Sequence, residues 1–271
     1  MNLLTVRNLG IILAESRRAL LDGVSFEIQS GERVGLIGES GSGKSITALA
    51  VLGLLPESMM PSGRITLAGT EMIGGSEESM RRVRGSAAAM IFQEPLSALD
   101  PLMRVGRQIE GPVSLHQGLR GTAARDAVMG LLARVKLPDP QRIASSFPHE
   151  LSGGQRQRVA LAMALAMALA CRPSLLIADE PTTALDVTVQ AEVLALLDEL
   201  VTADGMALLF ITHDLPVIAR VARKLLVMED GRVVESGEAG ALLRAPRHPS
   251  TARLLEAARQ VTALRYARGG A

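Results

Sequence analysis

Residues 38–45 read Gly-Glu-Ser-Gly-Ser-Gly-Lys-Ser, and this stretch decides how the rest of the chain is interpreted. It fits the pattern G-x-x-x-x-G-K-[ST], in which the glycines let successive backbone N–H groups converge on a phosphate. The apolar segment 33–37 predicts a buried strand before it, and segment 44–55 predicts a helix after it. The N-terminus of that helix would add a positive partial charge. A strand, a glycine-rich turn and a helix in this order predict a phosphate-binding loop.

The roles of the side chains in this loop follow from phosphate chemistry. Lys44 is expected to reach the β- and γ-phosphates of a nucleotide, and the Ser45 hydroxyl is expected to ligate Mg²⁺. A glycine-rich turn with a solvated lysine is the plainer alternative, but it does not explain the strand and the helix on either side. The predicted nucleotide-binding residues here are Gly38, Glu39, Ser40, Gly41, Ser42, Gly43, Lys44 and Ser45.

Two carboxylates follow a second apolar segment. Residues 175–178 predict a buried strand that leads into Asp179 and Glu180, and open α/β sheets bind ligands at the carboxyl ends of their strands. Asp179 is expected to hold magnesium through water, and Glu180 is expected to orient and deprotonate the water that attacks the γ-phosphate. A strand that ends in Asp-Glu is more often an ordinary polar loop, so this interpretation depends on the phosphate loop.

Two further polar residues follow strands in the same way. Gln93 comes after the apolar segment 88–92, and His213 comes after segment 207–212. Either residue alone would be interpreted as solvated or as a helix cap. Because four strands then end in residues suited to phosphate chemistry, Gln93 is predicted to contact magnesium and water, and His213 to contact the γ-phosphate. The predicted catalytic residues are Glu180, His213, Gln93 and Lys44, and the predicted metal contacts are Ser45, Gln93 and Asp179.

Along most of the chain, short β-branched runs alternate with longer runs rich in Ala, Leu and Met. This pattern predicts an α/β fold with a mostly parallel sheet covered by helices. The predicted buried strands are Arg33–Ile37, Ala88–Phe92, Leu175–Ala178 and Ala207–Thr212, and the predicted helices are Lys44–Leu55, Thr122–Lys136, Gly153–Cys171 and Val189–Ala203. The first quarter instead predicts antiparallel strands at Leu3–Val6, Val24–Ile28 and Arg64–Leu67.

Two other regions have their own signals. Asp230-Gly231 predicts a hairpin turn between strands 225–229 and 232–235. Prolines recur through residues 93–150, which otherwise predict helices and loops. Because strand-like segments resume after residue 150, we interpret this region as an inserted helical lobe and not as a separate domain.

The composition excludes several classes of protein. The chain has 271 residues, with 29 Lys and Arg against 28 Asp and Glu, so it lacks the basic field of a nucleic-acid-binding protein. Its one cysteine, Cys171, excludes a disulfide framework or a cysteine-ligated cluster within one chain. The longest uncharged apolar run, residues 159–171, is shorter than the roughly 20 residues that span a bilayer. The N-terminus lacks the features of a signal peptide. We therefore expect a soluble, cytosolic chain.

Two further motifs are present in the sequence. Residues 151–155 read Leu-Ser-Gly-Gly-Gln, and residues 184–186 read Ala-Leu-Asp. Together with the phosphate loop and the strand-end residues, these motifs resemble those of the ATPases of ATP-binding cassette (ABC) transporters, over nearly the whole chain. The resemblance implies a P-loop NTPase core of the RecA-like type, an N-terminal antiparallel β subdomain and an inserted α-helical subdomain. It implies ATP and Mg²⁺ as cofactors. It also implies that Ser152, Gly153, Gly154 and Gln155 face the nucleotide held by a second subunit. In isolation, this motif would also fit a serine N-cap before a flexible turn.

Longer segments are similar to one group within this family. Residues 91–109, 146–159, 175–190 and 247–257 look like the ATPases of dipeptide, oligopeptide and nickel importers. The last segment matches that group's His-Pro-Tyr-Thr pattern except that Ser250 replaces the tyrosine. The resemblance implies a second ATPase subunit (a sister chain or a copy of this one), two membrane permease subunits, indirect work with an extracytoplasmic solute-binding protein, and no nucleic acid. It implies a peripheral location on the cytoplasmic face of the inner membrane.

The resemblance also implies a division of the chain. Residues 1–271 would form a single ATPase domain with a core lobe at about 1–92 and 151–235, a helical subdomain at about 93–150 and a C-terminal tail at 236–271. The helical subdomain would dock the membrane partner, with the loop at Gln93 as the hinge. An ordinary surface lobe is the alternative.

Two features depart from the family's pattern. The family has an aromatic residue near positions 10–15 that stacks on adenine, whereas this chain has none there, so weak selection of the base is predicted. Residues 160–170 read ALAMALAMALA, which resembles a tandem duplication and lengthens the signature-to-carboxylate spacing by about one helical turn. Either the helix absorbs this turn by a bulge or an overrun, or Ser152 is displaced relative to Glu180.

The favoured function is therefore an ATP-hydrolysing subunit that powers an importer for peptides or a related small solute such as nickel. A soluble, non-transport ABC ATPase is one alternative. A nucleotide-dependent dimerisation module, whose hydrolysis is impaired by the extra turn, is the other.

Overall fold

The computed structural model describes residues 2–93, 99–151, 156–182 and 187–268, and the chain divides into two compact units. The first unit combines Met1–Arg81 with Ala207–Ala271, and the second is Arg82–Met206. Among the described residues, we find no helix with the length and apolar character needed to cross a bilayer. The boundaries predicted from the sequence for the core lobe, the helical subdomain and the tail remain a proposal.

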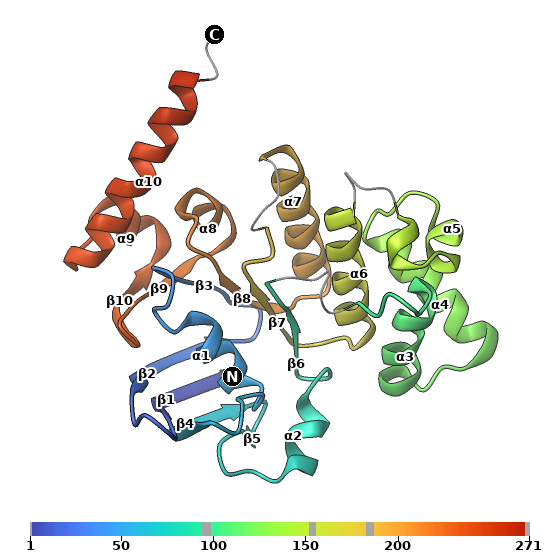
Figure 1. Ribbon diagram of the computed structural model, residues 1–271, viewed down its shortest axis with the longest axis horizontal. Coiled ribbons are helices and arrows are strands. Elements are labelled where there is room, and N and C mark those ends of the chain that lie inside the picture. The colour runs from blue at the N-terminus through green and yellow to red at the C-terminus, as the bar shows by residue number, and fades with distance from the viewer. Residues whose placement is uncertain (1, 94–98, 152–155, 183–186, 269–271) are drawn as a thin grey trace. The chain divides into compact units, whose positions relative to one another are not determined.

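The first unit contains the predicted N-terminal antiparallel sheet (Figure 1). Its strands, in the spatial order β2-β1-β4-β5, are β1 (Asn2–Leu13), β2 (Ala19–Gln29), β4 (Met59–Leu67) and β5 (Thr70–Glu71). All neighbouring pairs are antiparallel. The strands are much longer than predicted, and the register of β1 against β2 shifts at several points between Asn2 and Ile12. Such irregularities interrupt the regular alternation of side chains, and the sequence pattern therefore indicated only part of each strand.

A second sheet in the first unit supports the phosphate loop. Its strands, in the spatial order β10-β9-β3-β8, are β3 (Arg33–Gly38), β8 (Ala207–Ile211), β9 (Lys224–Glu229) and β10 (Arg232–Glu238). Strand β3 pairs in parallel with both β8 and β9, and almost every residue of β3 and all of β8 are buried. The predicted hairpin is confirmed, because Arg232 pairs with Glu229 across the Asp230-Gly231 turn.

Helices accompany these strands. They are α1 (Lys44–Val51), α8 (Leu215–Val221), α9 (Ala239–Arg244) and α10 (Pro249–Arg268), while α2 (Glu77–Val83) crosses the boundary between the units. Helix α1 ends earlier than the predicted Leu55. The Leu54 N–H bonds to the Leu49 carbonyl and the Gly53 N–H to the Ala50 carbonyl, with Gly53 at a φ of 61°. This is a Schellman cap, for which glycine is the preferred residue.

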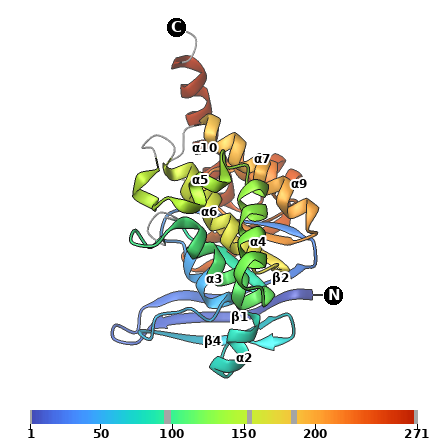
Figure 2. The same ribbon diagram turned by 90° about the vertical axis from the view of Figure 1, so that its right-hand side faces the viewer.

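Within its described residues, the second unit has one parallel strand pair (Figure 1) and a set of helices (Figure 2). The strands are β6 (Ala88–Ile91) and β7 (Leu175–Asp179), and the helices are α3 (Val105–Gln117), α4 (Gly121–Arg134), α5 (Pro140–Ser145), the short 3₁₀ helix η1 (Pro148–Glu150), α6 (Arg156–Ala170) and α7 (Val187–Ala203). The predicted helices 122–136 and 189–203 correspond to α4 and α7 within two residues. Helices α3, α4 and α5 fall within the predicted lobe 93–150.

The ALAMALAMALA repeat forms one continuous stretch of α6. Between Ala160 and Ala170, all side chains are buried except Ala164 and Met167, which are half-buried. A helix that is apolar on every side is expected to be enclosed by other elements. Within the described part of α6, the extra turn is thus accommodated as regular helix and not as a bulge. Ser152, whose displacement was the alternative, lies outside the described residues.

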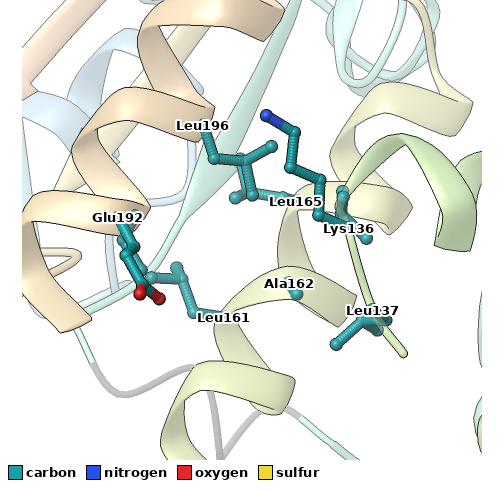
Figure 3. A pocket seen from close by; sticks show the side chains of 9 residues that line it. Lys136, Leu137, Leu161, Ala162, Leu165, Glu192 and Leu196 are labelled. Carbon is teal, nitrogen blue, oxygen red and sulfur yellow. The ribbon is translucent and has the colours of Figure 1, made fainter.

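The packing around the repeat leaves a small cavity of about 30 Å³. Figure 3 shows Leu161, Ala162 and Leu165 of α6 on one side of it and Leu196 of α7 on another. The segment that follows α4, with Lys136 and Leu137, completes the wall (Figure 3). Most of the lining side chains are apolar, with Lys136 and Glu192 as the charged residues of the wall. At this size the cavity holds about one water molecule and is too small for a nucleotide or another organic ligand.

Candidate functional site

The phosphate loop has the local structure that its sequence predicts. Strand β3 is buried up to Gly38, the loop turns over residues 39–43, and α1 starts at Lys44. Within the described residues, no side chain caps the start of α1, and its first turn contains no acidic residue. The backbone N–H groups at this helix end therefore remain suited to bind an anion.

Two glycines of the loop are required by its geometry. A Cβ atom on Gly38 would lie 2.3 Å from the carbonyl oxygen of Met228, a backbone atom that cannot move cheaply. Gly43 has a φ of 102°, and a Cβ atom there would lie 2.4 Å from Cδ2 of Leu21. Residues with a side chain rarely adopt such a φ. Glycine at these two positions therefore allows both the backbone conformation and the close approach of the loop to its neighbours.

Lys44 is held inside the loop. The side chain is 5% exposed, and Nζ donates hydrogen bonds of 2.8 Å to the carbonyl oxygens of Gly38 and Glu39. A third contact, of 3.4 Å, reaches the Ser42 hydroxyl. A buried ammonium group held by neutral carbonyls keeps its charge directed into the loop, where an anionic phosphate would be a stronger acceptor. Ser45, the next residue, is exposed.

The loop is also supported from behind. The Thr47 hydroxyl donates to the Gly43 carbonyl at 2.9 Å, and the Gly231 N–H donates to the Ser42 carbonyl at 3.1 Å. Sequence analysis identified Asp230-Gly231 only as a hairpin turn and missed this contact. A threonine four residues after the helix-starting glycine was the available signal for Thr47, but for Gly231 the sequence offers none, because the two partners are far apart in the chain.

His213 follows β8 at the same edge of the sheet as the loop. Leu36 of β3 pairs with Ile211 of β8, so Gly38 and His213 each follow their pair by two residues. The His213 side chain is exposed. The next residue, Asp214, is the N-cap of α8 and accepts a hydrogen bond from the Val217 N–H. His213 is therefore not the residue that caps this helix.

In the second unit, the structure brings Gln93 and Glu180 together. Strands β6 and β7 are parallel and in register from Ala88 with Leu175 onwards, so both residues follow the carboxyl ends of adjacent strands. The Gln93 amide Nε2 donates to the Glu180 carboxylate at 3.3 Å. Asp179, the last residue of β7, is 3% exposed. This pair can orient a water molecule, because Glu180 accepts a proton and Gln93 fixes the position of the carboxylate.

Glu180 also has an unusual backbone. Its φ is 47°, in the left-handed region that residues other than glycine seldom adopt. Such conformations cost roughly 1–3 kcal/mol and cluster at functional sites. No sequence signal indicated this conformation, because Asn and Asp, rather than Glu, are the residues enriched there.

Several predicted residues remain outside the description. The predicted residues Ser152, Gly153, Gly154 and Gln155, and also Ala184-Leu185-Asp186, lie outside the described residues. Within the described ranges, no three His, Cys, Asp or Glu side chains form a metal-binding group. Burial raises the pKa of the Cys171 thiol, which disfavours the thiolate form that nucleophilic catalysis would need.

Comparison with known proteins adds an independent result. The family model described as ABC transporter matches residues 21–183. The chain is 48% identical to the peptidoglycan transport ATP-binding protein YejF of Agrobacterium fabrum, over 94% of this chain and 47% of that protein. It is 46% identical to the dipeptide transport ATP-binding protein DppD of Escherichia coli, over 88% of this chain and 72% of that protein. The chain thus spans about half the length of the Agrobacterium relative.

Solved structures give the same answer for the fold. The dimeric post-hydrolysis structure of the ATP-binding cassette MJ0796, bound to ADP and Pi, is 27% identical, with a TM-score of 0.75 over 87% of this chain and 98% of that one. CbiO1 from Clostridium perfringens, part of the ABC transporter complex cbiONQ, is 26% identical, with a TM-score of 0.76 over 94% of this chain and 99% of that one. The predicted α/β fold of the P-loop NTPase type is therefore confirmed.

Proposed function

The chain belongs to the ABC transporter family, and from this premise we propose that it binds and hydrolyses ATP to power the import of peptides. The observation that carries the proposal is the enclosure of Lys44 by a glycine-rich loop at the uncapped start of α1. Nucleotide phosphates are the ligands that this arrangement suits. Peptide import is favoured over nickel because the relatives include a dipeptide transport protein.

Each predicted site residue has a role in this proposal. Lys44 exchanges its carbonyl partners for phosphate oxygens and neutralises their charge. Glu180 accepts a proton from the attacking water while the bond to the γ-phosphorus forms and the bond to the ADP oxygen breaks. Gln93 holds the Glu180 carboxylate through the contact described above, and His213 contacts the γ-phosphate. The products are ADP and inorganic phosphate.

The oxygen atoms available at these residues fit magnesium. Ser45 offers an exposed hydroxyl at the first turn of α1, and Asp179 offers a buried carboxylate at the end of β7. Gln93 adds an amide oxygen. Hydroxyl, carboxylate and amide oxygens are the ligands that Mg²⁺ prefers, usually with retained water. When bound, Mg²⁺ would neutralise charge on the nucleotide phosphates.

Partners are part of the proposal. One supporting observation is that the neighbour MJ0796 was solved as a dimer. A second cassette, a sister chain or a copy, would bring its Ser152, Gly153, Gly154 and Gln155 to the nucleotide, so that closure of the pair gates hydrolysis. Two permease subunits would transmit this closure, with a solute-binding protein acting outside the membrane and no nucleic acid involved. The chain would then lie at the cytoplasmic face of the inner membrane.

The direct test is the ATPase rate of the purified chain, alone and with permease subunits, compared with Lys44→Met. We expect the wild type to release phosphate from ATP and Lys44→Met to bind nucleotide at least tenfold more weakly, because a charge-assisted contact to phosphate is lost. Affinity purification from membranes is expected to recover integral membrane subunits. Recovery of ribosomes or RNA in their place would instead support a non-transport ATPase.

A further inference from the structure

Residues 228–231, at the end of β9 and the hairpin turn, form the backing segment of the phosphate loop. Met228 pairs with Gly38 in the parallel register of β9 and β3. The Gly231 N–H donates to the Ser42 carbonyl at 3.1 Å. The backing segment therefore touches the loop at its first residue and near its last, and any shift of this segment changes where the loop amides point.

The backing segment is in turn held by the C-terminal helix α10. Arg253 Nη2 lies 2.6 Å from Oε1 of Glu229 and donates to the Ser250 hydroxyl at 3.1 Å. A hydrogen bond with the Ser250 side chain, and after it the positive charges of Arg253 and His248, hold the pKa of Glu229 below its usual range. Glu229 is thus the one backing residue with an ionic contact to α10 among the described residues.

The start of α10 has a firm anchor of its own. The Glu235 carboxylate on β10 accepts hydrogen bonds from the backbone N–H groups of Arg247 and His248, at 2.9 and 3.1 Å. Ser250 and Thr251 are 6% and 0% exposed. Because the helix start is fixed by these contacts, Arg253 holds Glu229 against a rigid support.

A hollow of about 80 Å³ borders the loop, the backing segment and α10. It is lined by residues 39–42 of the loop, residues 228–230 of the backing segment, and Ser250 and Leu254 of α10. The described contacts connect the backing segment to the loop through Gly231 and Ser42, and to α10 through Glu229 and Arg253. A change in the Arg253–Glu229 contact can therefore reach the loop through the backing segment.

We propose that the start of α10 is a positioning element for the phosphate loop, in which Arg253 and Ser250 hold Glu229 and so fix the backbone that binds nucleotide phosphates. This inference rests on the proposed nucleotide binding. Arg253 and Glu229 are positioning residues and do not themselves touch the nucleotide. Because the ion pair is partly exposed, at 60% and 33% for the two side chains, its effect is expected to be moderate and sensitive to salt.

The test is isothermal titration of the full chain with ADP and Mg²⁺, for the wild type, Arg253→Met and Arg253→Lys. Loss of the positive charge in Arg253→Met is expected to raise the Kd by about two- to fivefold, while Arg253→Lys stays closer to the wild type. The ratio of the Arg253→Met Kd to the wild-type Kd should approach one at about 0.5 M salt, because salt screens an exposed ion pair. In ATPase assays the KM should rise by the same factor while kcat changes less than about twofold.

The matched control is Arg64→Met, which breaks a similarly exposed ion pair with Glu71 in the same unit, at 3.4 Å, but not one to the backing segment. Its Kd should equal that of the wild type. An unchanged Kd for Arg253→Met, or an equal rise for Arg64→Met or for Arg253→Lys, would overturn the positioning role. Failure of the wild type to bind ADP would instead overturn the proposed function itself.

Discussion

The phosphate loop and the end of the β6–β7 pair achieve their geometry by different means. Residues 38–45 are contiguous, and the contacts that shape this loop end mostly on backbone carbonyls, such as those of Gly38, Ser42 and Met228. Gln93 and Glu180 are 87 positions apart, and their contact joins two side chains. The contacts in the first region thus involve backbone acceptors, and the contact in the second region joins two side chains. Substitutions should therefore separate binding from hydrolysis.

The largest expected effect comes from Glu180→Gln, which keeps the shape of the side chain and its capacity to accept from Gln93 but removes the base. General-base catalysis contributes about 10²- to 10⁴-fold, so we expect phosphate release to fall by at least about 100-fold while the Kd for ATP changes less than about twofold. Single-turnover kinetics and titration calorimetry measure the two quantities. An unchanged rate would remove Glu180 from its assigned role and erase the contrast between the regions.

The next effect is expected from Gly38→Ala in the phosphate loop. The added methyl group would lie 2.3 Å from the Met228 carbonyl oxygen, so the loop or β9 must move, and overpacking of this kind costs about 1–3 kcal/mol. We expect nucleotide affinity to fall by about tenfold, with a lower thermal midpoint. Gly237→Ala on β10 is the matched control, because its methyl group meets no described atom within 4 Å. Equal affinities for the two variants would contradict a loop fixed by its backbone.

The smallest effect is expected from Gln93→Ala. The variant removes one hydrogen bond of 3.3 Å to Glu180, and such bonds contribute about 0.5–1.5 kcal/mol. Hydrolysis should fall by about three- to tenfold, with little change in the Kd for ADP measured without magnesium. Gln117→Ala provides the control, since that amide donates to the Ala170 carbonyl instead. A loss of affinity equal to the loss of rate would place Gln93 with the binding residues.

More of the structure of the phosphate loop than of the Gln93–Glu180 region could be predicted from the sequence. The phosphate loop could be predicted in detail, because its strand, glycines and helix start are local properties of neighbouring residues. That Gln93 and Glu180 follow strands of a parallel sheet was also predicted, but the adjacency of these two strands was not, because the sequence gives no strand order. The left-handed φ of Glu180 could not be predicted, because Glu is not among the residues enriched in that region. The contact of Glu229 with Arg253 could not be predicted either, because the sequence does not show that these two segments are neighbours.

The N-terminal strands show a related difference. Leu4, Val6 and Leu9 are buried, and the register of β1 against β2 shifts between Val6 and Leu9. A local irregularity of this kind re-aims the side chains. Pattern analysis therefore identified the regular part of β1 and missed its continuation to Leu13.

Helix α6 has a property that follows from its four-residue period. Loss or gain of one Ala-Leu-Ala-Met unit would change its length by about 6 Å and turn the following residues by only about 40°. The leucines and methionines that remain would still meet the enclosing side chains on nearly the same side. A change of one unit would therefore alter the separation of the two helix ends while leaving the orientation of the remaining side chains nearly unchanged.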